Sequence, residues 1–241
     1  MTIGLIGFGR FGRLAARYIA RRTAVLVYDH RRVPTGARSG RIRSRTLPEV
    51  ASQKVVVLAV PISHLPSVLK SIAPHLQPGA LVIDVCTVKV RPISWMKKIL
   101  PRSVYILGSH PMFGPDSDKG SLTGQQVVLT PVRLPDALLR RVTGVLRREG
   151  IRVEIMSAHR HDRMIAGTIL LTHYIGRLIA GAGLPRSASG TTSYKHLLSV
   201  VDVAMNDTLQ LLRDIWLYNP YTPRLIRSLD RSGRNLSRIL R

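Results

Sequence analysis

Short apolar runs alternate with amphipathic stretches through the first two thirds of the chain. The apolar runs are rich in valine, leucine and isoleucine and occupy 2–6, 24–28, 55–60, 81–85 and 104–107. Between them, helices are expected over 10–22, 47–53, 65–73 and 92–100. Fully apolar strands that alternate with helices are typical of a parallel sheet covered on both faces. The pattern therefore predicts an α/β fold with a doubly wound parallel sheet of the Rossmann type.

The rest of the chain is mostly helical. We expect a helix over 134–148 and a last strand over 151–155, followed by helices over 157–182, 191–218 and 223–229. The pattern predicts two domains, an α/β domain over 1–156 and a smaller all-helical domain over 157–241. A helical region of this length has too little surface to build a good core alone. We therefore expect it to dock against a second copy of the chain as a homodimer.

A glycine-rich loop joins the first predicted strand to the first predicted helix. Its sequence, Gly7-Phe8-Gly9-Arg10-Phe11-Gly12, has the Gly-x-Gly-x-x-Gly spacing. Gly7 permits a tight turn, Gly9 lets the backbone approach a pyrophosphate, and Gly12 lets the helix pack closely on the strand. The N-terminus of the helix faces the phosphates. In this context the motif predicts that 1–156 binds a dinucleotide cofactor.

An acidic residue after the second predicted strand bears on which dinucleotide binds. Asp29 lies 17 residues after Gly12, where a carboxylate can hold the adenosine ribose hydroxyls. Because a carboxylate repels a 2′-phosphate, Asp29 favours NAD. His30, Arg31 and Arg32 follow at once and can bind that phosphate instead, so NADP stays open.

Other candidate residues follow strand ends, which is where a doubly wound sheet binds its ligands. Val60 and Pro61 end the third apolar run, and Thr87 follows the fourth. His110 follows the fifth, within Ser109-His110-Pro111-Met112-Phe113-Gly114-Pro115. We expect this histidine to lie between the strand end and a rigid loop, with its imidazole available for acid/base chemistry near neutral pH. The alternative is an exposed histidine in a turn that the prolines and glycine shape.

The chain is strongly basic, with a formal net charge of +24 over 241 residues. Seven of its 37 basic residues are lysine and 30 are arginine, spread from Arg10 to Arg241. Such a charge raises the local concentration of an anionic substrate, and it keeps nucleic acid open as an alternative partner. However, no recognition-helix, zinc-finger or aromatic sheet motif accompanies the arginines, so we do not expect nucleic acid to bind.

Three further classes are not expected. No apolar run approaches the roughly 18 residues of a membrane span, and the chain starts directly with a strand, which predicts a cytoplasmic protein without a membrane segment. The single cysteine, Cys86, lies in apolar surroundings, so it is expected to be buried and no disulfide can form. No metal is expected at the site.

Several motifs occur in one order along nearly the whole chain. They are the glycine loop, Asp84-Val85-Cys86-Thr87-Val88-Lys89, the Ser109 to Pro115 segment, His161-Asp162 and Thr172-His173. Together they resemble the prephenate/arogenate dehydrogenase family. The resemblance implies an NAD(P)-dependent oxidative decarboxylation of prephenate to 4-hydroxyphenylpyruvate, or of arogenate to tyrosine, in tyrosine biosynthesis. It also implies that the helical domain forms the dimer interface.

The resemblance assigns roles to individual residues. His110 matches the family's catalytic histidine, which binds and polarises the substrate hydroxyl, and Thr87 stands where the family usually has a serine. Asp162 is expected to order the site, and Ser109 and His173 to help bind the substrate.

Asp162 and His173 are 11 residues apart, about three helical turns, and are expected to share one helix face. The substrate is a dianion and needs a cationic partner. Lys195, after Tyr194, stands where the family commonly has an arginine, and a lysine lacks the planar two-pronged grip on a carboxylate.

Two other interpretations remain at this stage. One is a two-domain NAD(P)-dependent dehydrogenase of the β-hydroxyacid type. Such enzymes rely on a lysine in their helical half, and Lys195 is the only lysine in the helical half of this chain. The other is a basic, redox-inactive protein that binds nucleic acid and keeps the nucleotide fold as a scaffold.

Overall fold

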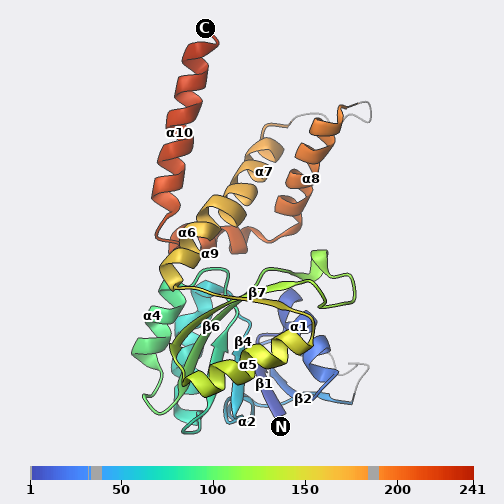
Figure 1. Ribbon diagram of the computed structural model, residues 1–241, viewed down its shortest axis with the longest axis vertical. Helices are drawn as coiled ribbons and strands as arrows, with labels where there is room; N and C mark the ends of the chain where they lie inside the picture. The colour runs from blue at the N-terminus through green and yellow to red at the C-terminus, as the bar shows by residue number, and fades with distance from the viewer. Residues whose placement is uncertain (1, 32, 34–39, 184–189) are drawn as a thin grey trace. The chain divides into compact units, whose positions relative to one another are not determined.

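A computed structural model describes residues 2–31, 33, 40–183 and 190–241 (Figure 1). Arg32 lies outside the described residues. The chain divides into two compact units, Met1–Ala158 and His159–Arg241.

The first unit is built on one eight-stranded sheet with the order β3-β2-β1-β4-β5-β6-β7-β8. The strands are β1 (Thr2–Ile6), β2 (Ala24–Tyr28), β3 (Ile42–Ser44), β4 (Val55–Leu58), β5 (Leu81–Asp84), β6 (Tyr105–Pro111), β7 (Gln126–Arg133) and β8 (Arg152–Ile155). Strands β1 to β6 are parallel, whereas β7 runs antiparallel to β6, and β8 runs parallel to β7. The predicted α/β class is confirmed, with a sheet that is mostly rather than wholly parallel.

Helices cover both faces of this sheet. They are α1 (Arg10–Ala20), α2 (Leu47–Ala51), α3 (Leu65–Ile72), α4 (Val90–Ile99) and α5 (Asp136–Arg148). Leu107 of β6 belongs to a cluster that packs against Leu138 and Val142 of α5. The next residue, Gly108, faces Ile93 of α4. Because neighbouring residues of a strand face opposite sides, α4 and α5 cover opposite faces of the sheet at β6.

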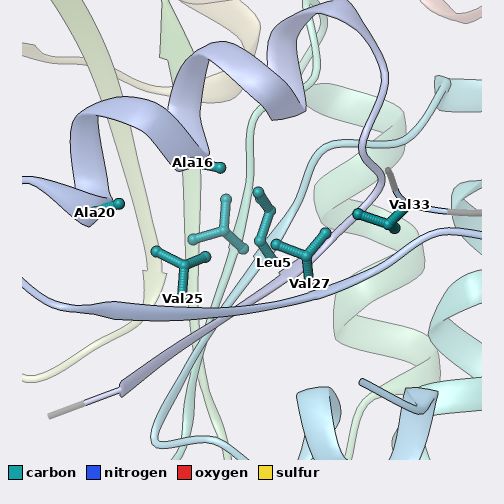
Figure 2. Close-up of a cluster of buried hydrophobic side chains, with 7 residues drawn as sticks. Leu5, Ala16, Ala20, Val25, Val27 and Val33 are labelled. Carbon is teal, nitrogen blue, oxygen red and sulfur yellow. The ribbon is translucent and has the colours of Figure 1, made fainter. Parts of the chain in front are cut away.

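The core beneath α1 holds the dinucleotide-binding end together. Its buried members are Leu5, Ala16, Ala20, Val25, Val27, Val33 and Val57. Figure 2 shows Ala16 and Ala20 of α1 facing Leu5, Val25 and Val27 of the strands below. Small alanines on the helix let it lie close to the sheet, which keeps the glycine loop in a fixed position.

The second unit is helical, as predicted. Its helices are α6 (Ala158–Ile165), α7 (Leu171–Gly181), α8 (Thr192–Asn206), α9 (Leu209–Tyr218) and α10 (Thr222–Ile239). The single helix predicted over 191–218 is wrong. It breaks at Asp207, and the Thr208 side chain caps α9 by accepting the Leu211 amide at 3.2 Å.

The long helix of the second unit contains a wide turn. Residues Ala158–Gly181 form one continuous helix of 24 residues, and Ala166–Leu170 within it have π-helical geometry. α7 and α8 lie side by side (Figure 1). They approach so closely that a Cβ at Gly176 would lie 2.5 Å from the Ala204 Cβ.

The same helix bears on the expectation that the chain has no membrane segment. Among the described residues it is long and apolar enough, by length and composition alone, to cross a membrane, with a mean hydropathy of 1.3 over 18 residues. Only 28% of that window is buried inside the unit. Yet the helix also carries the buried polar side chains of His161, Asp162 and His173. His161 and Asp162 partner each other at 2.7 Å, and His173 Nε2 lies 3.4 Å from Asp207 Oδ2.

Candidate active site

The glycine loop has the geometry that its motif predicts. Gly7 has a φ of 98°, and a Cβ there would lie 2.3 Å from the Ala59 carbonyl oxygen. A Cβ at Gly12 would lie 2.1 Å from the Gly7 oxygen, so α1 and β1 can only pack this closely with glycine at position 12. Gly9 caps α1, and no described atom comes within 4 Å of its Cβ position. That open space is where the backbone approaches a pyrophosphate in this type of loop.

Asp29 is tied to this loop. Its Oδ2 accepts the Phe8 amide at 2.6 Å, and its Oδ1 accepts the Arg31 amide at 2.9 Å. The His30 Nδ1 lies 3.2 Å from the same Oδ1, while the His30 and Arg31 side chains are exposed. The carboxylate thus links the end of β2 to the loop, and its position beside the loop fits a ribose-binding role. Val60 belongs to the same region, because its Cγ1 is 2.9 Å from the Cβ position of Gly7. Pro61 follows and is exposed.

A loop after β6 is fastened to α1, which the sequence did not predict. Arg10 forms an ion pair with Asp116, and Arg17 forms one with Asp118. The Tyr18 hydroxyl donates to Asp118 as well, and this hydrogen bond holds the pKa of Asp118 below its usual value, with help from Arg17. The oppositely charged residues are about 100 positions apart, so no local pattern reveals the contact. Phe11 of the glycine loop is half-buried.

His110 does not lie in a loop, which corrects the sequence prediction. It belongs to β6, is paired with Val128 of β7, and is only 5% exposed. β6 continues through Pro111 because it pairs with β7 as far as that residue. Proline has no backbone N–H, and a strand tolerates it where the sheet does not need an N–H donor. The neighbouring Ser109 is also buried, but its side chain faces the opposite side of the sheet. The structure therefore separates the Ser109 hydroxyl from the His110 imidazole.

Thr87 follows β5, the strand next to β6. Asp84 of β5 pairs with Gly108 of β6. Thr87 lies three residues after Asp84, and His110 lies two residues after Gly108. Both lie at the carboxyl edge of adjacent strands, as predicted. The Cys86 amide donates to Asp84 Oδ1 at 3.0 Å and shapes the turn that carries Thr87. Cys86 itself is buried, as expected.

Lys89 is a further residue of this edge that had no predicted role. Its side chain and that of Asp84 are both 0% exposed and form an ion pair. The Lys89 ammonium also donates to the Ser109 carbonyl at 2.6 Å. A lysine and an aspartate five residues apart in an apolar segment were a visible signal, because buried charges are almost always paired.

In the helical unit, Asp162 is fully buried and well supported. Its Oδ1 lies 2.7 Å from Nδ1 of the buried His161, and its carbonyl accepts the Asn219 side chain at 2.8 Å. Asn219 in turn accepts the Tyr221 amide at 2.9 Å. These bonds attach the turn between α9 and α10 to α6, so Asp162 has the ordered surroundings that its predicted role needs.

His173 is also buried, at 4% exposure. The prediction that it shares one helix face with Asp162 assumed 3.6 residues per turn, whereas five of the intervening residues lie in π turns. His173 Nε2 lies 3.4 Å from Asp207 Oδ2, and no described atom partners its Nδ1. Burial lowers the pKa of His173; Asp207 opposes this shift and Arg177 adds to it.

The cation beside His173 is Arg177, whose Nη2 donates to the Asp207 carbonyl at 2.6 Å. Lys195 is exposed in the first turn of α8. The predicted site residues thus fall into two groups. The first unit holds the glycine loop, Asp29 and the Thr87–His110 edge, and the second unit holds Asp162, His173 and Lys195.

A strand–glycine loop–helix unit, an acidic residue after β2 and a histidine at the carboxyl edge of β6 define a nucleotide-binding α/β dehydrogenase. Comparisons with known proteins identify its family. The family described as prephenate dehydrogenase, nucleotide-binding domain, matches residues 16–155. Arogenate dehydrogenase 2, chloroplastic, of Arabidopsis thaliana is 31% identical in an alignment that covers 95% of this chain and 67% of that protein.

A probable arogenate/prephenate dehydrogenase of Methanocaldococcus jannaschii is 24% identical, over 100% of this chain and 57% of that protein. The crystal structure of prephenate dehydrogenase from A. aeolicus in complex with hydroxyphenyl propionate and NAD+ aligns with a TM-score of 0.79 at 21% identity, over 100% of this chain and 90% of that chain. The chain belongs to the prephenate dehydrogenase family, which confirms the resemblance, and it carries the family's NAD(P)-binding domain.

Proposed function

We propose that this protein catalyses the NAD(P)-dependent oxidative decarboxylation of prephenate or arogenate. The observation that carries the proposal is His110, buried at the carboxyl edge of β6 in a domain whose glycine loop and Asp29 fit a dinucleotide. The relatives named above include both arogenate and prephenate enzymes.

The chain's own residues fit the cofactor. The open space at Gly9 and the N-terminus of α1 receive the pyrophosphate, and Asp29 receives the ribose hydroxyls. When bound, the cofactor supplies the hydride acceptor. We propose NAD as the preferred cofactor, because the Asp29 carboxylate repels the 2′-phosphate of NADP, although the exposed Arg31 lies beside it.

His110 acts as the proton acceptor in this proposal. Its imidazole takes the proton of the substrate hydroxyl as the carbinol carbon loses hydride, and the Thr87 hydroxyl assists from the neighbouring strand. Carbon dioxide then leaves as the ring becomes aromatic, which supplies the driving force. The protein has only to orient the ring and to hold one proton until the phenolate oxygen of the product takes it back. General-base help of this kind is worth about 10²–10⁴-fold in rate.

The helical unit contributes binding and assembly. His173 and Lys195 hold the anionic substrate, and Asp162 keeps α6 and the α9–α10 turn in place for them. We propose that this unit also docks against a second copy, because large apolar side chains stand exposed on it. They include Leu178, Val203, Met205, Leu217, Ile239 and Leu240. Sedimentation of the full chain at micromolar concentration tests this, and a monomer at all concentrations contradicts it.

One assay tests the proposed activity. Absorbance at 340 nm is followed with prephenate or arogenate, each paired with NAD or NADP. At least one combination is expected to form reduced cofactor. His110→Asn should lower kcat by about 10²–10⁴-fold, whereas the control His75→Asn, at an exposed histidine of the same unit, should not. No reduced cofactor in any of the four combinations, together with salt-sensitive submicromolar binding of mixed-sequence DNA, would instead support the nucleic-acid interpretation.

A further inference from the structure

Among the described residues, the carboxyl end of β6 has a neighbouring strand on one edge only. On one edge β7 continues alongside, pairing Ser109 with Leu129 and His110 with Val128. On the other edge β5 ends at Asp84, which pairs with Gly108. The last residues of β6, Ser109 to Pro111, therefore extend beyond the last residue of β5 that pairs with them.

The Lys89 side chain contacts the backbone of β6 just beyond the end of β5. Its Nζ donates to the Ser109 carbonyl at 2.6 Å, at the first residue of β6 that has no partner in β5. The same ammonium is paired with Asp84 at the end of β5. One side chain thus joins the end of β5, the start of α4 and the main chain next to His110.

The surroundings are shaped to admit this side chain. A Cβ at Gly108 would lie 3.2 Å from Lys89 Cδ and 3.1 Å from Ile93 Cδ1, so the absence of a side chain at Gly108 makes room for the lysine stem. Both Lys89 and Asp84 are 0% exposed. Burying an ion pair is a costly way to fill space, since apolar residues of similar volume often stabilise a fold as well or better. The buried pair is therefore weak evidence for stability, which makes a geometric role worth testing.

We propose that Lys89 is a positioning residue for His110: its ammonium holds the Ser109 carbonyl and so fixes the backbone that carries the imidazole. The proposal rests on the proposed function, in which His110 accepts the substrate proton. A base must lie within hydrogen-bond reach of that proton, and a displacement of about 1 Å costs about 10²-fold in rate. Loss of the Lys89 bond should therefore lower kcat and leave cofactor affinity in place.

The test must separate positioning from folding. Each single substitution leaves one buried charge unpaired, Asp84 in Lys89→Met and Lys89 in Asp84→Asn, so each risks unfolding and is assayed only where its thermal melt shows it folded. The informative variant is the double substitution Asp84→Asn with Lys89→Met, compared with Asp84→Asn alone. The single variant keeps the lysine amine that bonds to Ser109, and the double variant removes it. Lys97→Met, at an exposed lysine of the same helix, is the matched control.

Enzyme function (kcat, its pH profile and the cofactor Kd) and hydrogen exchange are both measured on the full chain. Relative to Asp84→Asn, the double variant should lose 10–100-fold in kcat, shift the pH profile of kcat, and keep its cofactor Kd within threefold. Hydrogen exchange in the free protein should also speed up at least tenfold in the peptide over 105–111. Lys97→Met should match the wild type in both.

The outcomes distinguish the two proposals. A double variant with the kcat, pH profile and exchange rates of Asp84→Asn overturns the positioning role, because the lysine then serves stability alone. A wild-type protein that turns over neither substrate overturns the proposed function, while the exchange comparison still decides whether Lys89 holds the end of β6.

Discussion

Gly9 and Gly12 lie in one loop but should fail in different ways when replaced by alanine. At Gly12 the new Cβ would meet the Gly7 oxygen at 2.1 Å, and that oxygen belongs to the backbone, so α1 must move away from β1. This opens the core beneath α1 that Figure 2 shows. Overpacking against a rigid neighbour costs about 3 kcal/mol, which in a protein of this size lowers Tm by about 6–12 °C.

At Gly9 the new Cβ enters open space, and the φ of −68° suits any residue. An alanine N-cap costs about 1 kcal/mol relative to glycine, and the reduced entropy of the unfolded chain returns about 0.4–1 kcal/mol. Tm should therefore stay within about 4 °C. Cofactor binding should weaken at least about tenfold, or about 1.4 kcal/mol, because the methyl group occupies the space of the pyrophosphate.

Thermal melting and calorimetric titration with NAD separate the two effects. Gly12→Ala should lose both stability and binding, and Gly9→Ala binding alone. Wild-type NAD affinity in Gly9→Ala would refute the placement of the pyrophosphate at this loop. A wild-type Tm in Gly12→Ala would refute the close contact between α1 and β1.

Three further predictions concern single side chains. Burial lowers the pKa of His173 below its unfolded value of 6.5, so the unfolded state takes up a proton first as the pH falls. The stability that this residue contributes is therefore complete above pH 6.5. It is lost as the pH drops through the folded pKa. Urea unfolding between pH 8 and 5 should show a shallower loss in His173→Gln than in the wild type, and equal slopes would contradict this. Asn219→Ala removes the 2.8 Å bond to the Asp162 carbonyl and should cost about 1–3 kcal/mol, measured by urea unfolding against the exposed control Asn235→Ala. Asp29→Ser removes the charge that repels a 2′-phosphate and the 2.6 Å bond from the Phe8 amide. NAD should then bind at least tenfold more weakly, while the ratio of NADP affinity to NAD affinity rises. A ratio that does not change would exclude Asp29 as the group that discriminates between the two cofactors.

The parts of the fold that depend on local pattern were predictable from the sequence. Gly7 and Gly12 mark the loop because only glycine fits their φ and contacts, and both constraints act within a few residues of the motif. The turn at Asp207 also had a local signal, since Thr208 is a good N-cap, but the surrounding leucines continue the helical spacing and concealed it.

The parts that depend on distant pairing were not predictable. His110 reads as a loop residue because proline and glycine follow it, and it becomes a strand residue only through β7, whose Val128 lies opposite. The short β3 lies in an arginine-rich stretch and exists because it pairs with β2. The hydrophobic spacing gives no sign of the π turns over Ala166–Leu170, although these turns lie between Asp162 and His173.

From the buried polar atoms of the helical unit we propose a binding role for His173. A core histidine normally uses both ring nitrogens, because a buried polar atom without a partner is costly. Here Asp207 faces Nε2, while Nδ1 is buried and has no partner among the described residues. The Nε atom of Arg177 is in the same condition one turn away. Arg177 Nε can donate to an anionic oxygen of a substrate, whereas His173 Nδ1 can do so only when the ring is protonated, so binding of an anion would raise the lowered pKa of His173.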